Sequence, residues 1–215
     1  MPPASSNHAR TLVFDFDGTI ADSFSTTLAI ANRLARIYGY RPLSDEDANY
    51  LRGRSYREAA EHMGLSWHKL PLIAHHVRRD MRASAGQLQM FEGMLPVLDE
   101  LRRSYTLGIL SSNSRENIES FTAAHGLKHF KFIHSASNIW GKARGIRALI
   151  RRHRLRQEEV VYVGDEVRDV EACQDVPVKV IAVGWGYTHP QRLSLSQPDR
   201  LIHHPDELPN AIAGL

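Results

Sequence analysis

Short apolar runs alternate along most of the chain with segments whose apolar residues recur at helical spacing. Several of these runs are rich in β-branched residues, and most end in a polar or glycine-containing turn, as buried parallel strands do. The predicted strands are Thr11–Phe16, Thr106–Leu110, Lys131–His134, Val160–Val163 and Val180–Val183. The helical patterns between them include Met94–Arg103, Glu116–His125 and Lys142–His153. Strands that alternate with helices predict an α/β fold with a doubly wound, Rossmann-like parallel sheet.

One region, from about Phe24 to Met90, breaks this alternation and carries no predicted strand. Its apolar positions instead predict four helices, Thr26–Tyr38, Ser44–Leu51, Tyr56–Met63 and Trp67–Ala83. Because this helical segment follows the first strand, we expect an inserted α-helical cap, residues 23–90, over the carboxyl edge of the sheet. Residues 1–22 and 91–215 are then expected to form the α/β core domain.

Composition narrows the classes of protein that fit this pattern. The chain has 215 residues, 42% of them hydrophobic and 24% charged, which is typical of a globular protein with a buried core. A net charge of +3 is too small for a nucleic-acid-binding surface, and no apolar run is long enough to span a membrane. The single cysteine, Cys173, allows no intrachain disulfide, and residues 1–10 lack the apolar centre of a signal peptide. We therefore expect a cytoplasmic protein without nucleic-acid or membrane partners, while its oligomeric state does not follow from the sequence.

Polar residues follow three of the predicted strands, at the edge where open α/β sheets bind their ligands. Asp15 and Asp17 end the first strand two residues apart, so in an extended chain both carboxylates point to the same side. Two such carboxylates repel each other unless a cation or a shared proton lies between them. A bound divalent metal ion is one explanation. Aspartates that cap the following turn are the other, and this pair alone does not decide between the two.

A second acidic pair favours the metal ion. Asp165 and Asp169 follow the strand Val160–Val163 through a glycine. Carboxylates from two strand ends would complete an oxygen-rich site of the kind that Mg²⁺ prefers. Asp169 alone also fits a carboxylate that stabilises the N-terminus of a helix. That interpretation does not account for the other three aspartates.

Two further segments are suited to a phosphate group. Ser111 and Ser112 lie at a strand-to-helix junction, where hydroxyl and backbone N–H groups bind phosphate oxygens or simply cap a helix. Lys142 opens a predicted helix, where its charge opposes the helix dipole. That position suggests an anionic partner, although a lysine exposed to solvent is the ordinary interpretation. Neither segment is specific by itself.

Taken in order along the chain, these four segments resemble the haloacid dehalogenase superfamily. The likeness is to its phosphatase branch with a helical cap, and closest to phosphoglycolate phosphatase-like hydrolases. The matching segments are Asp15-Phe16-Asp17-Gly18-Thr19-Ile20-Ala21-Asp22-Ser23, Ser111, Lys142 and Gly164-Asp165-Glu166-Val167-Arg168-Asp169. The resemblance extends from Thr11 to about Leu208, and its first and last motifs are the specific ones. It implies a magnesium-dependent hydrolase that acts on a small phosphorylated metabolite.

The resemblance also implies a role for each residue of the site. Asp15 would attack phosphorus and form an aspartyl-phosphate, and Asp17 would act first as a general acid and then as a general base. The residues that would hold Mg²⁺ are Asp15, Asp17 through its backbone carbonyl, Asp165 and Asp169. The residues that would bind the phosphoryl oxygens are Ser111, Ser112 and Lys142.

The second aspartate, Asp17, is what favours phosphate esters. Members of the superfamily that cleave carbon–halogen or carbon–phosphorus bonds lack it. Two alternatives stay open: a β-phosphoglucomutase-like phosphotransferase, and a non-catalytic binding module, which the retained acidic residues disfavour. In the cap, Arg52 and Arg54 are suited to a second anionic group of a substrate. A linking loop with exposed charges is the interpretation of these arginines that the sequence favours.

Overall fold

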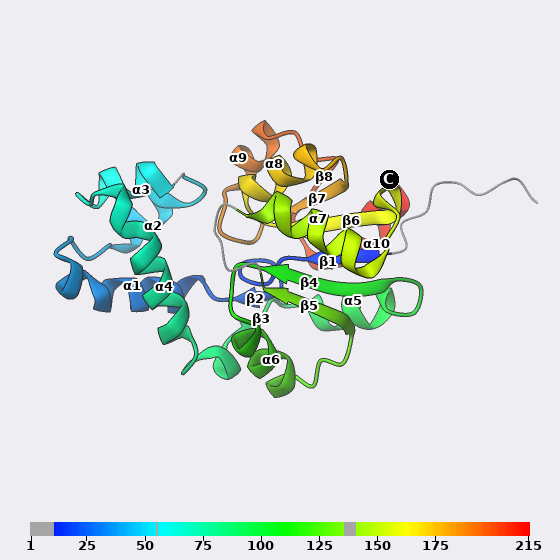
Figure 1. The fold of residues 1–215 in the computed structure, drawn as a ribbon, viewed down its shortest axis with the longest axis horizontal. Coiled ribbons are helices and arrows are strands. Elements are labelled where there is room, and N and C mark those ends of the chain that lie inside the picture. The colour runs from blue at the N-terminus through cyan, green and yellow to red at the C-terminus, as the bar shows by residue number, and fades with distance from the viewer. Residues whose placement is uncertain (1–10, 55, 136–140) are drawn as a thin grey trace, which may run out of the picture.

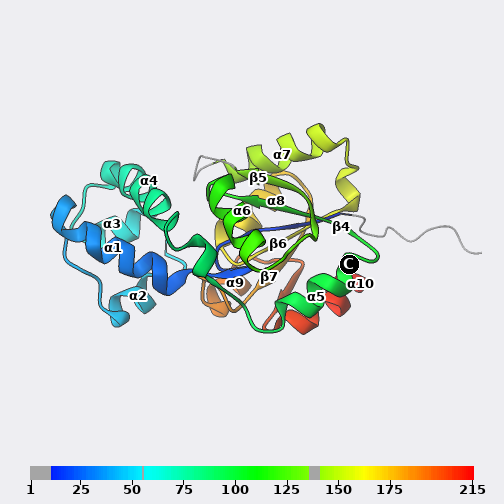
Figure 2. The same ribbon diagram turned by 90° about the horizontal axis from the view of Figure 1, so that it is seen from below.

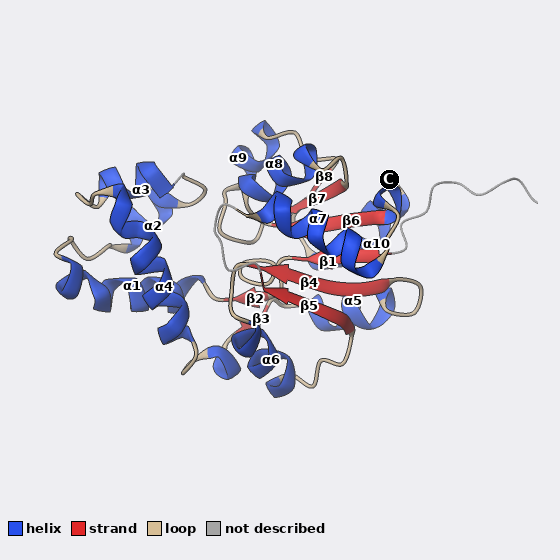
Figure 3. Ribbon diagram, in the orientation of Figure 1, coloured by secondary structure: helices blue, strands red, loops and turns tan. Residues whose placement is uncertain are grey.

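The computed structural model of the protein describes residues 11–54, 56–135 and 141–215. Six parallel strands of these residues form one sheet in the order β5-β4-β1-β6-β7-β8 (Figures 1 and 3). The strands are β1 (Thr11–Phe14), β4 (Thr106–Ser111), β5 (Phe130–Ser135), β6 (Val160–Gly164), β7 (Lys179–Val183) and β8 (Arg200–Ile202). The strand order runs outward from β1 in both directions, so the sheet is doubly wound, and the predicted fold class is confirmed.

Helices cover both faces of this sheet. One face carries α5 (Met94–Leu101), α6 (Arg115–Ala124) and α10 (Leu208–Ala213). The other face carries α7 (Lys142–His153), α8 (Val167–Asp175) and α9 (Pro190–Leu195), and Figure 2 shows α7 and α10 on opposite sides. Within β1, Leu12 and Phe14 pack with the first group and Val13 packs with the second. Because β1 is buried on both faces, its sequence is apolar without interruption.

The inserted segment forms a helical cap beyond the carboxyl ends of the strands, in the direction in which the arrowheads of β4 and β5 point (Figure 1). Its helices are α1 (Phe24–Tyr38), α2 (Asp45–Leu51), α3 (Tyr56–His62) and α4 (Leu70–Met81). Helix α2 begins at a capping box, in which the Ser44 hydroxyl accepts the Asp47 N–H and the Asp47 carboxylate accepts the Ser44 N–H. None of the described helices, here or in the core, has the length and apolar character of a membrane span.

The chain enters and leaves the cap side by side. Two short strands, β2 (Ala21–Asp22) and β3 (Gln89–Met90), pair in antiparallel fashion, with Ala21 opposite Met90 and Asp22 opposite Gln89. The prediction that no strand lies between Phe24 and Met90 is therefore wrong at its last residues. A strand of two residues is too short to show an alternating pattern in the sequence.

Further differences from the predictions include two element boundaries and one strand. Strand β1 ends at Phe14, because the Phe16 carbonyl accepts the N–H groups of the following turn, in which Gly18 has a φ of +76°. The helix predicted from Trp67 begins only at Leu70, after a 3₁₀ turn and with a proline in its first turn. Strand β8 was not predicted, because it has only three residues and begins with an exposed arginine.

Candidate active site

The predicted site residues meet at the carboxyl edge of the sheet, on the side of the cap. Asp15 and Asp17 follow β1, Ser111 ends β4 and Asp165 follows β6, and these three strands are neighbours in the sheet. Lys142 is the first residue of α7. Because parallel strands end at the same edge, the topology brings together residues that are far apart in the sequence.

Three carboxylates form a compact, buried cluster at this edge. Asp15, Asp165 and Asp169 each offer an oxygen atom, these atoms all lie within 4.8 Å of one another, and none of the three residues is more than 2% exposed. The Lys142 ammonium group contacts one carboxylate oxygen of Asp15 and one of Asp169. Four residues from three separate segments therefore form one charged group in the interior.

Lys142 is itself buried, and its carboxylate partners keep it charged. Burial lowers the pKa of Lys142, but the negative charges of Asp15 and Asp169 outweigh burial and hold that pKa well above its ordinary value. These two contacts also explain why a lysine is found at the start of a helix, where the dipole disfavours a positive charge.

Hydrogen bonds fix the orientation of the other two acids. The Thr19 hydroxyl and the Tyr187 backbone N–H each donate to Asp165 at 2.7 Å, and the Glu166 backbone N–H donates to Asp169 at 3.1 Å. Burial is the largest cause that raises the pKa of Asp165 well above its ordinary range and that of Asp169 to about 6. Neighbouring carboxylates add to both shifts, and the charge of Lys142 counteracts the shift of the Asp169 pKa without cancelling it.

The residues present fit a divalent cation. When all three are ionised, Asp15, Asp165 and Asp169 carry three negative charges against the single positive charge of Lys142, so two negative charges are left uncompensated. Carboxylate oxygens are the ligands that Mg²⁺ prefers, and one such ion would offset both charges. The cluster is therefore suited to hold a hard divalent ion.

The carboxylate of Asp17 stands apart from this cluster. One of its oxygens accepts a hydrogen bond of 2.8 Å from the side-chain amide of Asn113. Burial raises the pKa of Asp17 to about 6, although the Ser23 hydroxyl and the Asn113 amide counteract it. The two predicted roles of Asp17, in acid–base chemistry and in metal binding through its backbone carbonyl, stay predictions.

The two serines at the end of β4 differ in their surroundings. Ser111 is buried, and its hydroxyl oxygen accepts the Asn113 backbone N–H at 3.1 Å. Ser112, in contrast, lines the cavity that faces the cap. Ser111 is the last residue of β4 and Ser112 lies in the bend that follows, so the two side chains have different surroundings.

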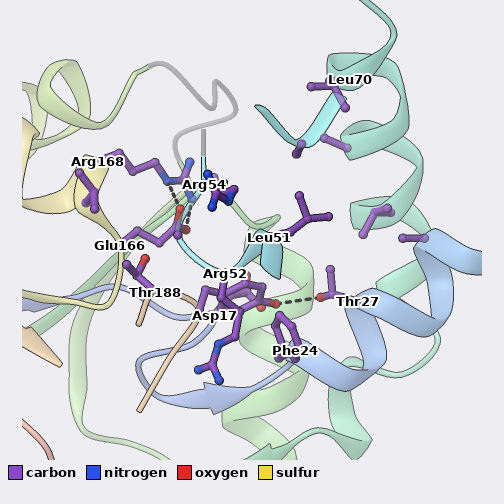
Figure 4. Close-up of a pocket in the computed structure, with 18 of the residues that line it drawn as sticks. Asp17, Phe24, Thr27, Leu51, Arg52, Arg54, Leu70, Glu166, Arg168 and Thr188 are labelled. Carbon is purple, nitrogen blue, oxygen red and sulfur yellow. Dashed lines mark hydrogen bonds and ion pairs between the residues drawn. The ribbon is translucent and has the colours of Figure 1, made fainter. Parts of the chain in front are cut away.

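This cavity has a volume of about 690 Å³ and lies between the site and the cap helices (Figure 4). Asp17, Ser112 and Lys142 line it from the core. Phe24 and Leu51 line it from the cap, and Figure 4 shows both in the region of Asp17. The predicted acid, one serine and the lysine thus border the same space as the cap.

Arg52 and Arg54 of the cap also line the cavity and are partly buried. Arg52 donates to the backbone carbonyl of Gly186, and its guanidinium lies 5.4 Å from the centre of the Phe24 ring. Arg54 pairs with Glu58 at 3.0 Å. Both arginines lie in the loop that links α2 and α3, as that interpretation has it, but they are partly buried and not fully exposed.

Several residues that position the acids were not predicted, among them Thr19, Asn113 and Tyr187. The available signal was the glycine-rich run after β7. A Cβ atom on Gly186 would lie 2.3 Å from the Asp165 Cβ atom and 2.3 Å from the Gly18 carbonyl oxygen. Only a glycine lets the backbone pass close enough for the Tyr187 N–H to reach Asp165.

Residues 12–183 match the sequence family described as haloacid dehalogenase-like hydrolase. The chain belongs to this family. The predicted membership of the haloacid dehalogenase superfamily of hydrolases is thereby confirmed. The roles of the individual site residues stay predictions.

Individual relatives agree with this placement. The phosphoglycolate phosphatase of Synechococcus elongatus is 40% identical to this haloacid dehalogenase-like chain over 209 residues, which is 96% of this chain and 98% of the relative. The N-acetylmuramic acid 6-phosphate phosphatase of Pseudomonas putida is 25% identical over 216 residues, with 94% and 96% of the two chains covered. The crystal structure of a predicted phosphatase from Clostridium acetobutylicum superposes with a TM-score of 0.83 at 17% identity, over 97% of this chain and 100% of that one.

Proposed function

We propose that this protein is a Mg²⁺-dependent phosphohydrolase that cleaves a small phosphate monoester through an aspartyl-phosphate on Asp15. The observation that carries the proposal is the buried cluster of Asp15, Asp165 and Asp169 around Lys142 at the carboxyl edge of the sheet. A phosphoryl group approaches such a cluster only if positive charge offsets the carboxylates. Lys142 and a divalent ion together supply that charge.

In the proposed reaction, a carboxylate oxygen of Asp15 bonds to phosphorus while the bond between phosphorus and the ester oxygen breaks. Asp17 donates a proton to the departing oxygen. Water then attacks the aspartyl-phosphate with Asp17 as the base, which releases inorganic phosphate and restores Asp15. The hydrogen bond from Asn113 supports this role, because it fixes the direction of the Asp17 carboxylate.

The other residues hold and neutralise the phosphoryl group. Mg²⁺, when bound to Asp15, Asp165, Asp169 and the Asp17 carbonyl, offsets negative charge on the phosphoryl oxygens. We propose that Lys142 binds the same oxygens, together with the Ser112 hydroxyl and the backbone N–H groups at the end of β4. Ser111 then supports this segment through its hydrogen bond with Asn113.

The 40% identity to a phosphoglycolate phosphatase supports phosphoglycolate, the phosphate ester of a two-carbon acid, as a substrate. We also propose that residues 1–22 and 91–215 form the catalytic core and residues 23–90 the cap, which closes over the bound ester and excludes water. The site of action that we propose is the cytoplasm.

The test is the release of inorganic phosphate from 2-phosphoglycolate, with Mg²⁺ and with excess EDTA. We expect EDTA to abolish release and Asp15→Asn to lower kcat by about 10³-fold or more. Asp22→Asn is the matched control, because Asp22 is an exposed aspartate of the same segment outside the cluster. Undiminished phosphate release by the Asp15→Asn variant would exclude Asp15 as the nucleophile. Interconversion of sugar phosphates without release would identify a phosphotransferase instead.

A further inference from the structure

The cavity does not end at the acids but continues into the cap. On this side its walls are apolar side chains of the cap: Leu28 of α1, Met63 in the turn after α3, and Leu70 and Val77 of α4. Figure 4 shows Leu70 on the far side of the space from Asp17. The cavity therefore joins the candidate catalytic residues to an apolar chamber.

Small side chains leave room for this chamber. Each of the four cap helices contributes one alanine to the lining of the cavity: Ala31 of α1, Ala48 of α2, Ala59 of α3 and Ala74 of α4. Protein interiors are normally close-packed, and inward positions of a helical bundle are filled with larger apolar residues. Here the space is kept open from all four sides.

Charged side chains border the cavity from the core, Asp17, Lys142, Glu166 and Arg168 among them, and from the cap, at Arg52, Arg54 and Arg78. Arg52 and Arg78 reach back to the core, where they donate to the backbone carbonyls of Gly186 and Ser112. Among the described residues of the cap, two hydroxyl groups border the cavity, and both are already engaged: Thr27 shares a hydrogen bond of 2.9 Å with the Tyr187 hydroxyl, and Tyr40 donates to a backbone carbonyl. The described side chains that line the cavity from α1 and α4 are apolar except for Thr27 and Arg78, so a ligand that reaches these two helices meets mainly hydrocarbon.

The volume also exceeds what a two-carbon leaving group needs. Pockets of about 300–1,000 Å³ bind molecules of drug size, and this cavity of about 690 Å³ lies in the middle of that range. A glycolate group would lie near Asp17 and Lys142 and leave the apolar chamber free.

We infer that the substrates of this enzyme include phosphate monoesters whose leaving group carries a hydrocarbon segment. The phosphoryl group lies against Lys142, and the hydrocarbon segment lies between α1 and α4 in the apolar chamber. This inference rests on the proposed function and deepens it, because it names the class of leaving group. Transfer of each methylene from water into such a chamber favours productive binding by about three- to fourfold.

The first test is a series of linear esters, from ethyl to hexyl phosphate, assayed for phosphate release with Mg²⁺ beside 2-phosphoglycolate. We expect kcat/KM to rise about three- to fourfold for each methylene until the chamber is filled. A flat or falling series, with ethyl phosphate or 2-phosphoglycolate hydrolysed, overturns the inference and leaves the proposed function intact.

The second test fills the chamber. Ala31→Leu places a larger side chain on its wall, whereas Ala29→Leu makes the same change on the exposed side of the same helix. We expect Ala31→Leu to lower kcat/KM for hexyl phosphate by about tenfold or more, and to leave ethyl phosphate within about twofold. Ala29→Leu should change neither. Ala74→Leu, on α4, repeats the test if Ala31→Leu does not fold. An equal loss for both esters, or no loss for hexyl phosphate, contradicts the inference.

The third test does not require hydrolysis. Alkylphosphonates have a carbon–phosphorus bond in place of the ester, and their affinity is measured by calorimetry with Mg²⁺ present. We expect the Kd to fall with chain length in the wild type, and to stop falling in Ala31→Leu. Chain-length-dependent binding without release from any ester would refute the hydrolase and leave the chamber as an apolar binding site. Binding that is independent of chain length would refute the chamber.

Discussion

The side-chain amide of Asn113 connects the candidate general acid to the base of the cap. It donates to Asp17, while its own carbonyl oxygen accepts from Asn117 at 2.8 Å, and Asn117 also donates to the Arg78 backbone carbonyl in α4 at 3.0 Å. Because a small misplacement of a catalytic group costs about 10² in rate, we expect Asn113→Ala to lower kcat by about that factor with little change in KM. Asn210→Ala, an exposed change on α10, is the control. A rise in KM at constant kcat would show that Asn113 binds substrate instead of holding Asp17.

Gly186 sets the distance between the loop after β7 and the acidic cluster. The methyl group of Gly186→Ala would collide with Asp165 and with the Gly18 carbonyl, so the loop must shift. This shift would strain the hydrogen bond that the Tyr187 backbone N–H donates to Asp165. Changes around a metal ligand commonly cost about 10–100-fold in metal affinity. We therefore expect the Mg²⁺ concentration for half-maximal phosphate release to rise by about tenfold or more. If the Mg²⁺ concentration for half-maximal release is unchanged, this loop does not position Asp165 as a metal ligand.

At the scale of elements, one carboxylate joins three parts of the cap. Asp47 of α2 accepts two hydrogen bonds from Arg41, at 2.7 and 2.8 Å, contacts His62 of α3 at 2.7 Å, and completes the capping box with Ser44. These partners, Arg41 foremost, hold the pKa of Asp47 well below its ordinary value of 3.8. We expect Asp47→Asn to lower the Tm of the protein at pH 7, whereas Asp45→Asn, at an exposed acid of the same helix, has little effect.

The sign of the pH dependence follows from that shift. Since the pKa of Asp47 is lower in the folded than in the unfolded chain, the stabilisation is complete above the unfolded value of 3.8 and is lost as the pH falls below it. The Tm difference between the wild type and Asp47→Asn, measured by circular dichroism, should therefore shrink from pH 5 to about pH 3. A Tm difference that does not change with pH would show that the Asp47 side chain stabilises the cap independently of its negative charge.

How much of these elements the sequence predicts depends on their length and burial. The strands β1, β6 and β7 are buried on both faces, and their continuous apolar runs were enough to predict them. The strands β2 and β3 have only two residues each, which is too few for an alternating pattern in the sequence. Their pairing is seen only in the structure. Asp15 and Asp165 were predictable because each directly follows a strand, and Asp17 and Asp169 because each lies within a few residues of one of them.

Other parts of the site depend on contacts that no local pattern carries. Ser112 lines the cavity because β4 ends at Ser111 and the chain bends there. The sequence does not show at which of the two serines the strand ends. The Tyr187 N–H reaches Asp165 from a loop that follows a different strand. That Arg52 lines the cavity follows only from how the cap is placed over the core.

For the molecule as a whole, the acidic cluster connects stability to the proposed metal ion. Burial holds the pKa of Asp165 and of Asp169 above the ordinary range, which disfavours their ionised forms. Because Mg²⁺ would bind these carboxylates in their ionised form, it should stabilise the folded protein. At about 100 times its Kd, a ligand adds about 2.7 kcal/mol, which for a chain of this size raises Tm by about 5–10 °C. Thermal unfolding with Mg²⁺ and with EDTA measures this shift. Asp165→Asn should reduce it strongly, and the same shift in that variant would place the ion elsewhere.

The two crossings between core and cap lie side by side, with Asp22 opposite Gln89. Antiparallel neighbours of this kind are about 5 Å apart, a gap that a tight turn can close. We therefore propose that the intervening bundle is an exchangeable module, because all four aspartates belong to the part of the chain that would be left unaltered. We expect that grafting a different bundle at this junction would change which alcohol is released without rebuilding the groups that we propose break the bond.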